Sequence, residues 1–331
     1  MGGQGKDEQE KERVVHIVLG TMTFGPRMDA AGAARAVADF VAAGAGAGEL
    51  DTAFMYGGGE TETILGEVLA ERGWDGITVA TKAHPNAAAG TPSLRPEEVE
   101  RQLTGSLQKL QRDAVDLFYL HSPDNDTSLE QTLEACARLH AAGRFRRLGM
   151  SNYAAWQVAD AHHICKRNGW PLPAVYQGMY NAVTRDVEPE LLPCLRHLGM
   201  SFYAYNPLAG GLLTGRYVGA EALPGSGRFH DMANYRPRYW QPSYLSAMAG
   251  VQEACAAAGV SMTAAALAWM NHHSGLVAAA GDAVILGAST REQLAANLAA
   301  CRAAPLDTTV VAAFDAAWET CRPDCPRYLR T

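Results

Sequence analysis

The chain has 331 residues, 48% of them hydrophobic, and a net charge of −7 from 28 Lys and Arg against 35 Asp and Glu. This length accommodates two average domains or one large α/β barrel. The acidic balance disfavours nucleic-acid binding, which needs basic patches, and no apolar run approaches the length of a transmembrane helix.

Residues 1–13, MGGQGKDEQEKER, are polar and charged. They predict a disordered tail that precedes one domain over residues 14–331. The tail lacks the apolar stretch of a secretory signal. The seven cysteines are scattered and odd in number, which indicates reduced thiols, and none has enough suitably spaced partners for a metal site. We therefore expect a cytoplasmic protein that binds no metal.

Short apolar or β-branched runs alternate with longer helical patterns along most of the chain. The runs predict strands at residues 15–20, 48–53, 77–82, 115–121, 145–151, 174–179, 201–206 and 283–288. Apolar residues at three- and four-residue spacing predict helices at 30–43, 60–72, 96–111, 128–142, 154–168, 187–198, 243–258 and 291–301. This alternation is typical of parallel βαβ units, in a doubly wound sheet or in a closed (β/α)8 barrel.

Polar residues stand at the C-terminal ends of most of these strands. They are Asp51, Lys82, His121, Ser151, Asn152, Gln177, Tyr205, Asn206, Ser289 and Thr290. Ligands of a doubly wound sheet contact mainly the loops at one switch point, whereas all eight loops of a barrel meet at one mouth. The glycine cluster at 44–48 follows a helix and precedes a strand, the reverse of a dinucleotide-binding fingerprint. The pattern therefore favours a single-domain TIM barrel.

Residues 216–242, RYVGAEALPGSGRFHDMANYRPRYWQP, form a long segment after the strand at 201–206. Loops of this length in a compact domain are usually functional. The segment predicts a lid over a ligand that is partly anionic and partly flat, and a solvated insertion is the alternative. The residues that carry this prediction are Arg228, Tyr235, Arg236, Arg238, Tyr239 and Trp240.

Four residues at or just past strand ends combine the groups that reduction of a carbonyl requires. Tyr56 can donate a proton, although the free pKa of tyrosine is about 10. The ammonium of Lys82 would favour the phenolate and lower that pKa, and Asp51 would hold the ammonium charged. His121 would orient the carbonyl or take part in a proton relay. Each residue taken singly also has an ordinary structural explanation: a helix cap for Asp51, loop packing for Tyr56, a solvated side chain for Lys82 and a core histidine for His121.

These residues lie within longer strings that together resemble the aldo-keto reductases, from about residue 14 to the C-terminus. The strings are GTMTFG (20–25), LDTAFMYGGGETETILG (50–66), DLFYLHSPD (116–124), LGMSNY (148–153) and YNPLAGGLLTGRY (205–217). The stretch 180–215 and the ending CPRYLRT are similar to the aflatoxin-aldehyde and succinic-semialdehyde reductase subgroup. Thr331, which extends past the usual final arginine, and the glycines at 57–59 depart from that subgroup's pattern.

The resemblance implies an enzyme that reduces aldehydes with NADP(H). It implies that Asp51 lies beside the cofactor, and that the nicotinamide is bound by Ser151, Asn152, Gln177 and the stacking ring of Tyr205. The implied pyrophosphate cradle consists of Asn206, Pro207, Leu208, Ala209, Gly210, Gly211, Leu212, Leu213, Thr214, Gly215 and Arg216. The implied adenosine end consists of Gly287, Ala288, Ser289, Thr290, Gln293 and Asn297, with Arg228 favouring NADPH over NADH.

The resemblance also places Tyr235, Arg238 and Arg330 at the mouth, where the substrate meets His121. Two arginines predict aldehydes that carry a carboxylate or a neighbouring oxygen, such as succinic semialdehyde or dicarbonyls. The subgroup further implies a homodimer. The alternative from another class is a cofactor-binding regulatory subunit, of the kind found in channels, with little turnover. A metal-dependent barrel isomerase or hydrolase would need ligands that the strand ends lack.

Overall fold

The computed structural model of the protein describes residues 15–44, 48–74, 76–87, 90, 92–219 and 222–330. Three features discussed above lie outside the described residues. They are the predicted tail at 1–13, the centre of the glycine cluster at 44–48, and Thr331.

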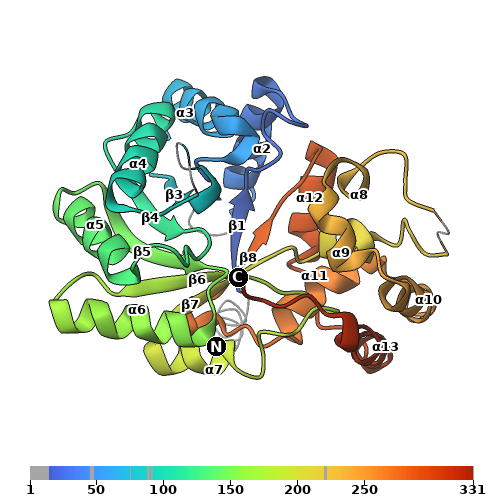
Figure 1. Ribbon diagram of the computed structural model, residues 1–331. Coiled ribbons are helices and arrows are strands. Elements are labelled where there is room, and N and C mark those ends of the chain that lie inside the picture. The colour runs from blue at the N-terminus through green and yellow to red at the C-terminus, as the bar shows by residue number, and fades with distance from the viewer. Residues whose placement is uncertain are drawn as a thin grey trace, which may run out of the picture.

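Parallel strands β1 to β8 close a barrel in chain order (Figure 1). The ring closes because β1 pairs with β8, with Leu19 opposite Leu286. The predicted TIM barrel is confirmed, and each predicted strand is present with ends shifted by no more than about two residues, within the usual uncertainty of boundaries. The strands are β1 (His16–Gly20), β2 (Glu49–Asp51), β3 (Thr78–Ala83), β4 (Val115–Leu120), β5 (Phe145–Ser151), β6 (Pro173–Met179), β7 (Ser201–Tyr205) and β8 (Ala283–Leu286).

Helices surround the strands (Figure 1). The main ones are α2 (Ala30–Ala42), α3 (Glu60–Arg72), α4 (Pro96–Leu110), α5 (Leu129–Ala141), α6 (Ala155–Asn168), α7 (Leu191–Leu198), α10 (Pro242–Ala257), α11 (Met262–His272), α12 (Arg291–Ala300) and α13 (Thr308–Cys321). Short 3-10 turns are η1 (Tyr56–Gly59), η2 (Pro85–Ala87), η3 (Ala209–Thr214), η4 (Ala233–Tyr235), η5 (Ala278–Ala280) and η6 (Arg322–Asp324).

The structure differs from the predicted helices in two places. α7 begins at Leu191 and not at residue 187, because Glu190 has φ −126°, outside the helical range. Helices α11 and α13, which pack beside α12 and α10 respectively, were not among the predicted elements. Most residues of α11 are buried and apolar on all sides, so this helix lacks the alternation of polar and apolar faces that marks a surface helix.

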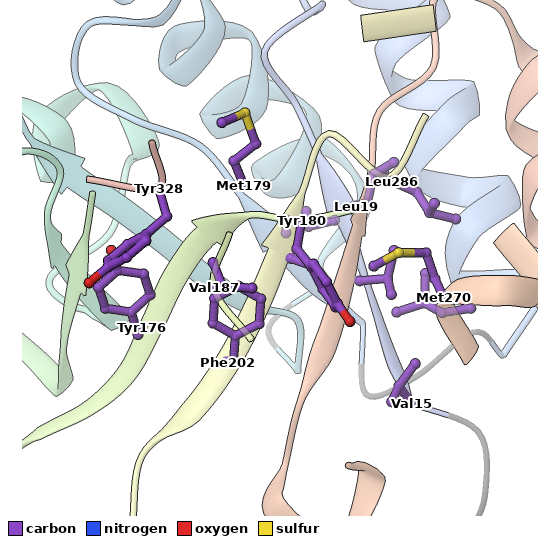
Figure 2. Close-up of a cluster of buried hydrophobic side chains, with 14 of the residues drawn as sticks. Val15, Leu19, Tyr176, Met179, Tyr180, Val187, Phe202, Met270, Leu286 and Tyr328 are labelled. Carbon is purple, nitrogen blue, oxygen red and sulfur yellow. The ribbon is translucent and has the colours of Figure 1, made fainter. Parts of the chain in front are cut away.

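Two layers of apolar side chains hold the barrel. Side chains alternate along each strand, so Val18 joins the inner cluster while Leu19 joins the outer one. Figure 2 shows part of the outer layer, with Tyr180, Phe202 and Met270 of α11 among the buried side chains drawn. The inner cluster fills the barrel with Val18, Ala80, Leu117, Tyr119, Val175, Tyr203, Ala283 and Ile285. Because the interior is filled, a ligand can bind only at the mouth of the barrel.

The long segment 216–242 packs onto the barrel. It contains α8 (Arg228–Asp231), η4 and α9 (Arg236–Tyr239). Phe229 and Tyr239 are fully buried and Tyr235 nearly so. A Cβ added at Gly210 would lie 2.8 Å from the ring of Tyr235, which shows how closely the segment covers η3. These buried aromatic residues favour the prediction of a lid over that of a solvated insertion, whereas residues 222, 223, 225 and 226 of the segment are exposed.

The described residues contain neither a single membrane-spanning helix nor a disulfide. Among the described helices, none is by itself long and apolar enough to cross a membrane, and α10 with α11 qualifies only as a pair bent by 91°. All seven cysteines are free. Burial raises the pKa of the Cys136 and Cys301 thiols, so these side chains act as apolar packing groups and not as nucleophiles.

Candidate active site

Asp51 and Lys82 form a buried ion pair at the C-terminal ends of β2 and β3. The distance from Lys82 Nζ to Asp51 Oδ1 is 2.5 Å, and Nζ also donates to the carbonyl oxygen of Thr52 at 2.6 Å. Gln177, on β6, donates from Nε2 to Asp51 Oδ2 at 2.8 Å. Burial raises the pKa of Asp51 and lowers that of Lys82, and the charge of each partner opposes the other's shift. The pair is held in one geometry from three strands.

The phenol of Tyr56 lies next to this pair. Lys82 Nζ is 3.5 Å from Tyr56 Oη and 4.9 Å from the centre of its ring. The chain turns sharply after Tyr56 because Gly57, Gly58 and Gly59 have φ values of 56°, 64° and 100°, which other residues rarely adopt. This turn places the phenol over the ends of β2 and β3.

The protonation of Tyr56 differs from the sequence-based expectation. Burial raises its pKa well above that of free tyrosine, and the carboxylate of Asp51 adds to the effect. The prediction that Lys82 lowers this pKa is therefore wrong for this structure. Lys82 is closer to Asp51 than to the phenol, so the ion pair presents little net positive charge to Tyr56, while burial disfavours the phenolate. Tyr56 carries its proton throughout the physiological pH range.

His121 follows β4 and faces Tyr56. The two rings meet edge to face, with centroids 5.8 Å apart and planes at 80°. Burial, with the positive charge of Lys82 as a second cause, lowers the pKa of His121 well below its ordinary value. Its Nδ1 is buried and has no hydrogen-bond partner among the described residues. A neutral ring favours orientation of a substrate oxygen over service as a charged member of a proton relay.

The residues predicted to bind the nicotinamide join the same network. Asn152 Nδ2 donates to the carbonyl oxygen of His121 at 2.9 Å and to Ser151 Oγ at 3.0 Å. Tyr205 Oη donates to Asn152 Oδ1 at 2.7 Å. Asn152 has φ 65°, a conformation that asparagine tolerates better than most residues. The structure thus brings the amide and hydroxyl groups of Ser151, Asn152, Gln177 and Tyr205 beside the predicted catalytic tetrad, which consists of Asp51, Tyr56, Lys82 and His121. This set of groups fits a carboxamide.

The segment predicted to hold the pyrophosphate is the turn that follows β7. Asn206, Ala209, Gly210, Gly211 and Gly215 all have positive φ, between 48° and 106°. Neighbouring residues of this kind can form backbone concavities that bind anions. Here the N–H groups of Ala209, Gly211, Leu213 and Gly215 donate to carbonyl oxygens of the turn itself, so the pyrophosphate role stays a prediction.

The adenosine end is only partly brought together as predicted. Thr290 Oγ1 caps α12 by accepting from Gln293 N at 3.2 Å, and Gln293 Oε1 accepts from Ser289 N at 3.0 Å. The guanidinium of Arg228 lies 5.2 Å from the ring centre of Tyr235, and no hydrogen bond or ion pair joins it to residues 287–297. Arg228 therefore contacts Tyr235, and its role at the 2′-phosphate stays a prediction.

The predicted substrate residues gather from the lid segment and the C-terminus. Arg238 lies 5.2 Å from the ring centre of Tyr235, whose hydroxyl donates to Asn206 Oδ1 at 3.1 Å. Arg330 donates its backbone N–H to the carbonyl oxygen of Asn152 at 2.8 Å, and the chain end lies over the middle of the ring of strands in Figure 1.

Tyr328 anchors the C-terminal segment. Its backbone N–H donates to Asp186 Oδ2 at 3.1 Å and its hydroxyl to Glu190 Oε2 at 2.7 Å. The same hydroxyl accepts from Ala155 N at 3.1 Å. These contacts hold Arg330, two residues further along, beside the predicted active site.

One residue at the site was missed by the sequence analysis. His84 follows β3 directly, and its ring centre is 5.0 Å from that of His121, with the planes at 85°. The signal that could have found it is its place at a strand end, two residues after Lys82, which is the criterion that identified the other polar residues.

Comparison with known proteins agrees with this geometry. A family model described as the aldo/keto reductase family matches residues 16–319. The chain belongs to the aldo/keto reductase family. It is therefore an oxidoreductase, and membership implies a nicotinamide cofactor. The predicted family is confirmed.

Individual relatives support the predicted subgroup as well. Aflatoxin B1 aldehyde reductase member 2 of Homo sapiens is 52% identical over 327 residues, which cover 96% of this chain and 90% of that protein. Aldo-keto reductase family 7 member A3 of Homo sapiens is 49% identical over 95% of this chain and 96% of its own length. An aldo-keto reductase of Pseudocercospora fijiensis is 41% identical over 85% of this chain and 96% of its own length.

Proposed function

We propose that the protein reduces aldehydes to alcohols with NADPH, and that Tyr56 donates the proton. The observation that carries the proposal is the buried ion pair of Asp51 and Lys82, with the half-buried Tyr56 and His121 beside it, at the mouth of a filled barrel. Relatives about half identical over nearly the whole chain, two of whose names contain aldehyde reductase, support the choice of substrate class.

The residues of the chain divide the work as follows. The cofactor, when bound, supplies a hydride to the carbonyl carbon. Neutral His121 donates a hydrogen bond that orients the carbonyl oxygen. Tyr56 gives its phenolic proton to that oxygen, which is a stronger base than phenolate once the carbon is reduced. Lys82 stabilises the phenolate that remains. Its charge therefore matters after Tyr56 has given up its proton, and not while Tyr56 is still protonated.

The preference for NADPH rests on the subgroup resemblance and on the fit of the mouth residues to a dinucleotide. Ser151, Asn152 and Gln177 suit the carboxamide, and the turn that follows β7 suits the pyrophosphate. The contact of Arg228 with the 2′-phosphate stays a prediction; its guanidinium lies 5.2 Å from the ring centre of Tyr235.

Cofactor choice is tested by following the absorbance of the reduced nicotinamide with an aromatic aldehyde and either NADPH or NADH. We expect turnover, with kcat/KM about 10- to 100-fold higher for NADPH, since a hydrogen bond to a charged group contributes about 1.5–3 kcal/mol. Reactions without aldehyde serve as the control. Binding of NADPH without its oxidation would favour the alternative of a regulatory subunit. Equal use of both cofactors would contradict the choice of NADPH.

We further propose that the arginines at the mouth select aldehydes that carry a carboxylate. Arg238→Ala is expected to lower kcat/KM for succinic semialdehyde about 10- to 100-fold relative to pentanal, because a charge-assisted hydrogen bond is lost. Arg236→Ala is the matched control, since that side chain donates to the carbonyl oxygens of Phe229 and His230 on the same segment. Equal losses on the two aldehydes would argue against an anion-binding role for Arg238.

The regulatory-subunit alternative is disfavoured because the tetrad is complete and closely placed. The homodimer and the cytoplasmic location remain predictions. The free state of all seven cysteines supports a reducing compartment.

A further inference from the structure

The backbone of His84 is held in place by a neighbouring helix. Its N–H donates to Gln102 Oε1 at 2.9 Å, and Gln102 Nε2 donates to its carbonyl oxygen at 3.1 Å. Gln102 belongs to α4 and is fully buried, so water does not compete for these two hydrogen bonds. His84 is therefore a fixed part of the mouth, although it lies just outside β3.

The ring of His84 is also oriented, and its proton can be assigned. The N–H of Asn86 donates to His84 Nδ1 at 3.0 Å, so Nδ1 is the acceptor and the proton of a neutral ring lies on Nε2. Burial, with the charge of Arg330 as a second cause, lowers the pKa of His84 to about 4. The ring is therefore neutral at physiological pH. Nε2 forms no hydrogen bond with any residue that the structure describes, so its N–H is available to a ligand.

His84 extends a row of rings that begins at the proposed proton donor. Tyr56 meets His121 at 5.8 Å and 80°, and His121 meets His84 at 5.0 Å and 85°. A carbonyl oxygen held by Tyr56 and His121 thus lies one ring away from His84. Two oxygens on adjacent carbons lie about 3 Å apart by standard bond lengths. A second oxygen next to the reacting aldehyde can therefore reach His84 while the first stays on His121.

We propose that His84 is a specificity-determining residue that donates the N–H of its Nε2 to a second substrate oxygen on the carbon next to the aldehyde. This inference rests on the proposed function. It assigns to His84 the selection of aldehydes with a neighbouring carbonyl or hydroxyl group, which the sequence analysis had linked to the arginines. An uncharged donor suits an uncharged oxygen, whereas a carboxylate further along the substrate suits Arg238 and Arg330. A site built to hydrogen-bond such an oxygen disfavours the analogue that lacks it.

The test compares methylglyoxal with propanal, which has the same three-carbon chain without the second oxygen. His84→Phe keeps a flat ring against His121 but has no N–H. We expect the kcat/KM of this variant to fall about 10- to 100-fold for methylglyoxal, because the second oxygen of the substrate loses its hydrogen bond and stays unpaired. For propanal we expect a change of less than about threefold. His84→Gln, which retains side-chain N–H donors, should recover most of the methylglyoxal activity.

The outcomes separate the possible roles of His84. Equal losses on both aldehydes would show that the residue acts through His121 or the fold, and unchanged kinetics on both would show no role; either result overturns the proposal. If His84→Phe weakened the binding of NADPH, measured by fluorescence titration, that result would also overturn the proposal. A wild-type enzyme inert toward both aldehydes contradicts the proposed function and this inference with it. An active enzyme with unchanged selectivity contradicts only the inference.

Discussion

Tyr56→Phe is expected to lower kcat for aldehyde reduction by about 10²–10⁴-fold, the usual contribution of a positioned general acid. Phenylalanine preserves the ring that contacts Lys82 and His121, so the fold and cofactor binding should be retained. The measurement is kcat with a saturating aldehyde, together with the dissociation constant of NADPH from fluorescence titration.

Tyr119→Phe is the matched control for this prediction. Tyr119 is a buried tyrosine of the inner cluster whose ring centre lies 5.7 Å from Lys82 Nζ, on the same ammonium that Tyr56 contacts. Removal of its hydroxyl should change kcat by less than about threefold, because it is not a member of the proposed proton path. If Tyr56→Phe retained more than about a tenth of the wild-type activity, the proton would have to come from another group.

Lys82→Met is expected to destabilise the protein by about 3–5 kcal/mol and to abolish most turnover. The loss of stability follows because Asp51 would remain buried and charged without its partner, a cost of this size for a broken buried pair. The loss of turnover follows because no cation would stabilise the phenolate of Tyr56. Urea denaturation gives the first quantity and reduced-nicotinamide absorbance gives the second.

The double variant Asp51→Asn with Lys82→Met separates the two effects. With no buried charge left, it should regain a large part of the lost stability while remaining inactive, a coupling that a double-mutant cycle measures directly. If the double variant were as unstable as Lys82→Met alone, the destabilisation would come from packing and not from an unpaired charge. If it recovered activity, Lys82 would have no role in proton transfer.

The barrel could be predicted because its strands are short buried runs, most of which have a polar residue at one end. Asp51, Lys82 and Gln177 come from strands that are distant in sequence, and their common position at strand ends was enough to place them together. His84 also stands at a strand end, but Lys82 was already the polar residue identified for that strand, and His84 was overlooked. Its ring becomes significant only beside His121.

Electrostatic properties were predicted less well than positions. The acidified Tyr56 was expected from the mere presence of Lys82, but a pKa depends on distances and burial. The structure shows the ammonium closer to Asp51 than to the phenol, and partial desolvation of the phenol disfavours its phenolate. Arg228 is a similar case. Its charge suggested a phosphate contact, and the folded lid segment places its guanidinium on Tyr235.

By itself, the sequence determined the family, through the strings that resemble the aldo-keto reductases. It also determined the barrel and the identity of the proposed tetrad, because these depend on periodicity and on residues at strand ends. Only the tertiary structure decided the protonation of Tyr56 and His121, the contact made by Arg228, and the place of His84 in a row of rings. The physical reason is that hydrogen bonding, burial and pairwise charge act over a few ångströms between residues far apart in the chain. Those distances exist only after folding.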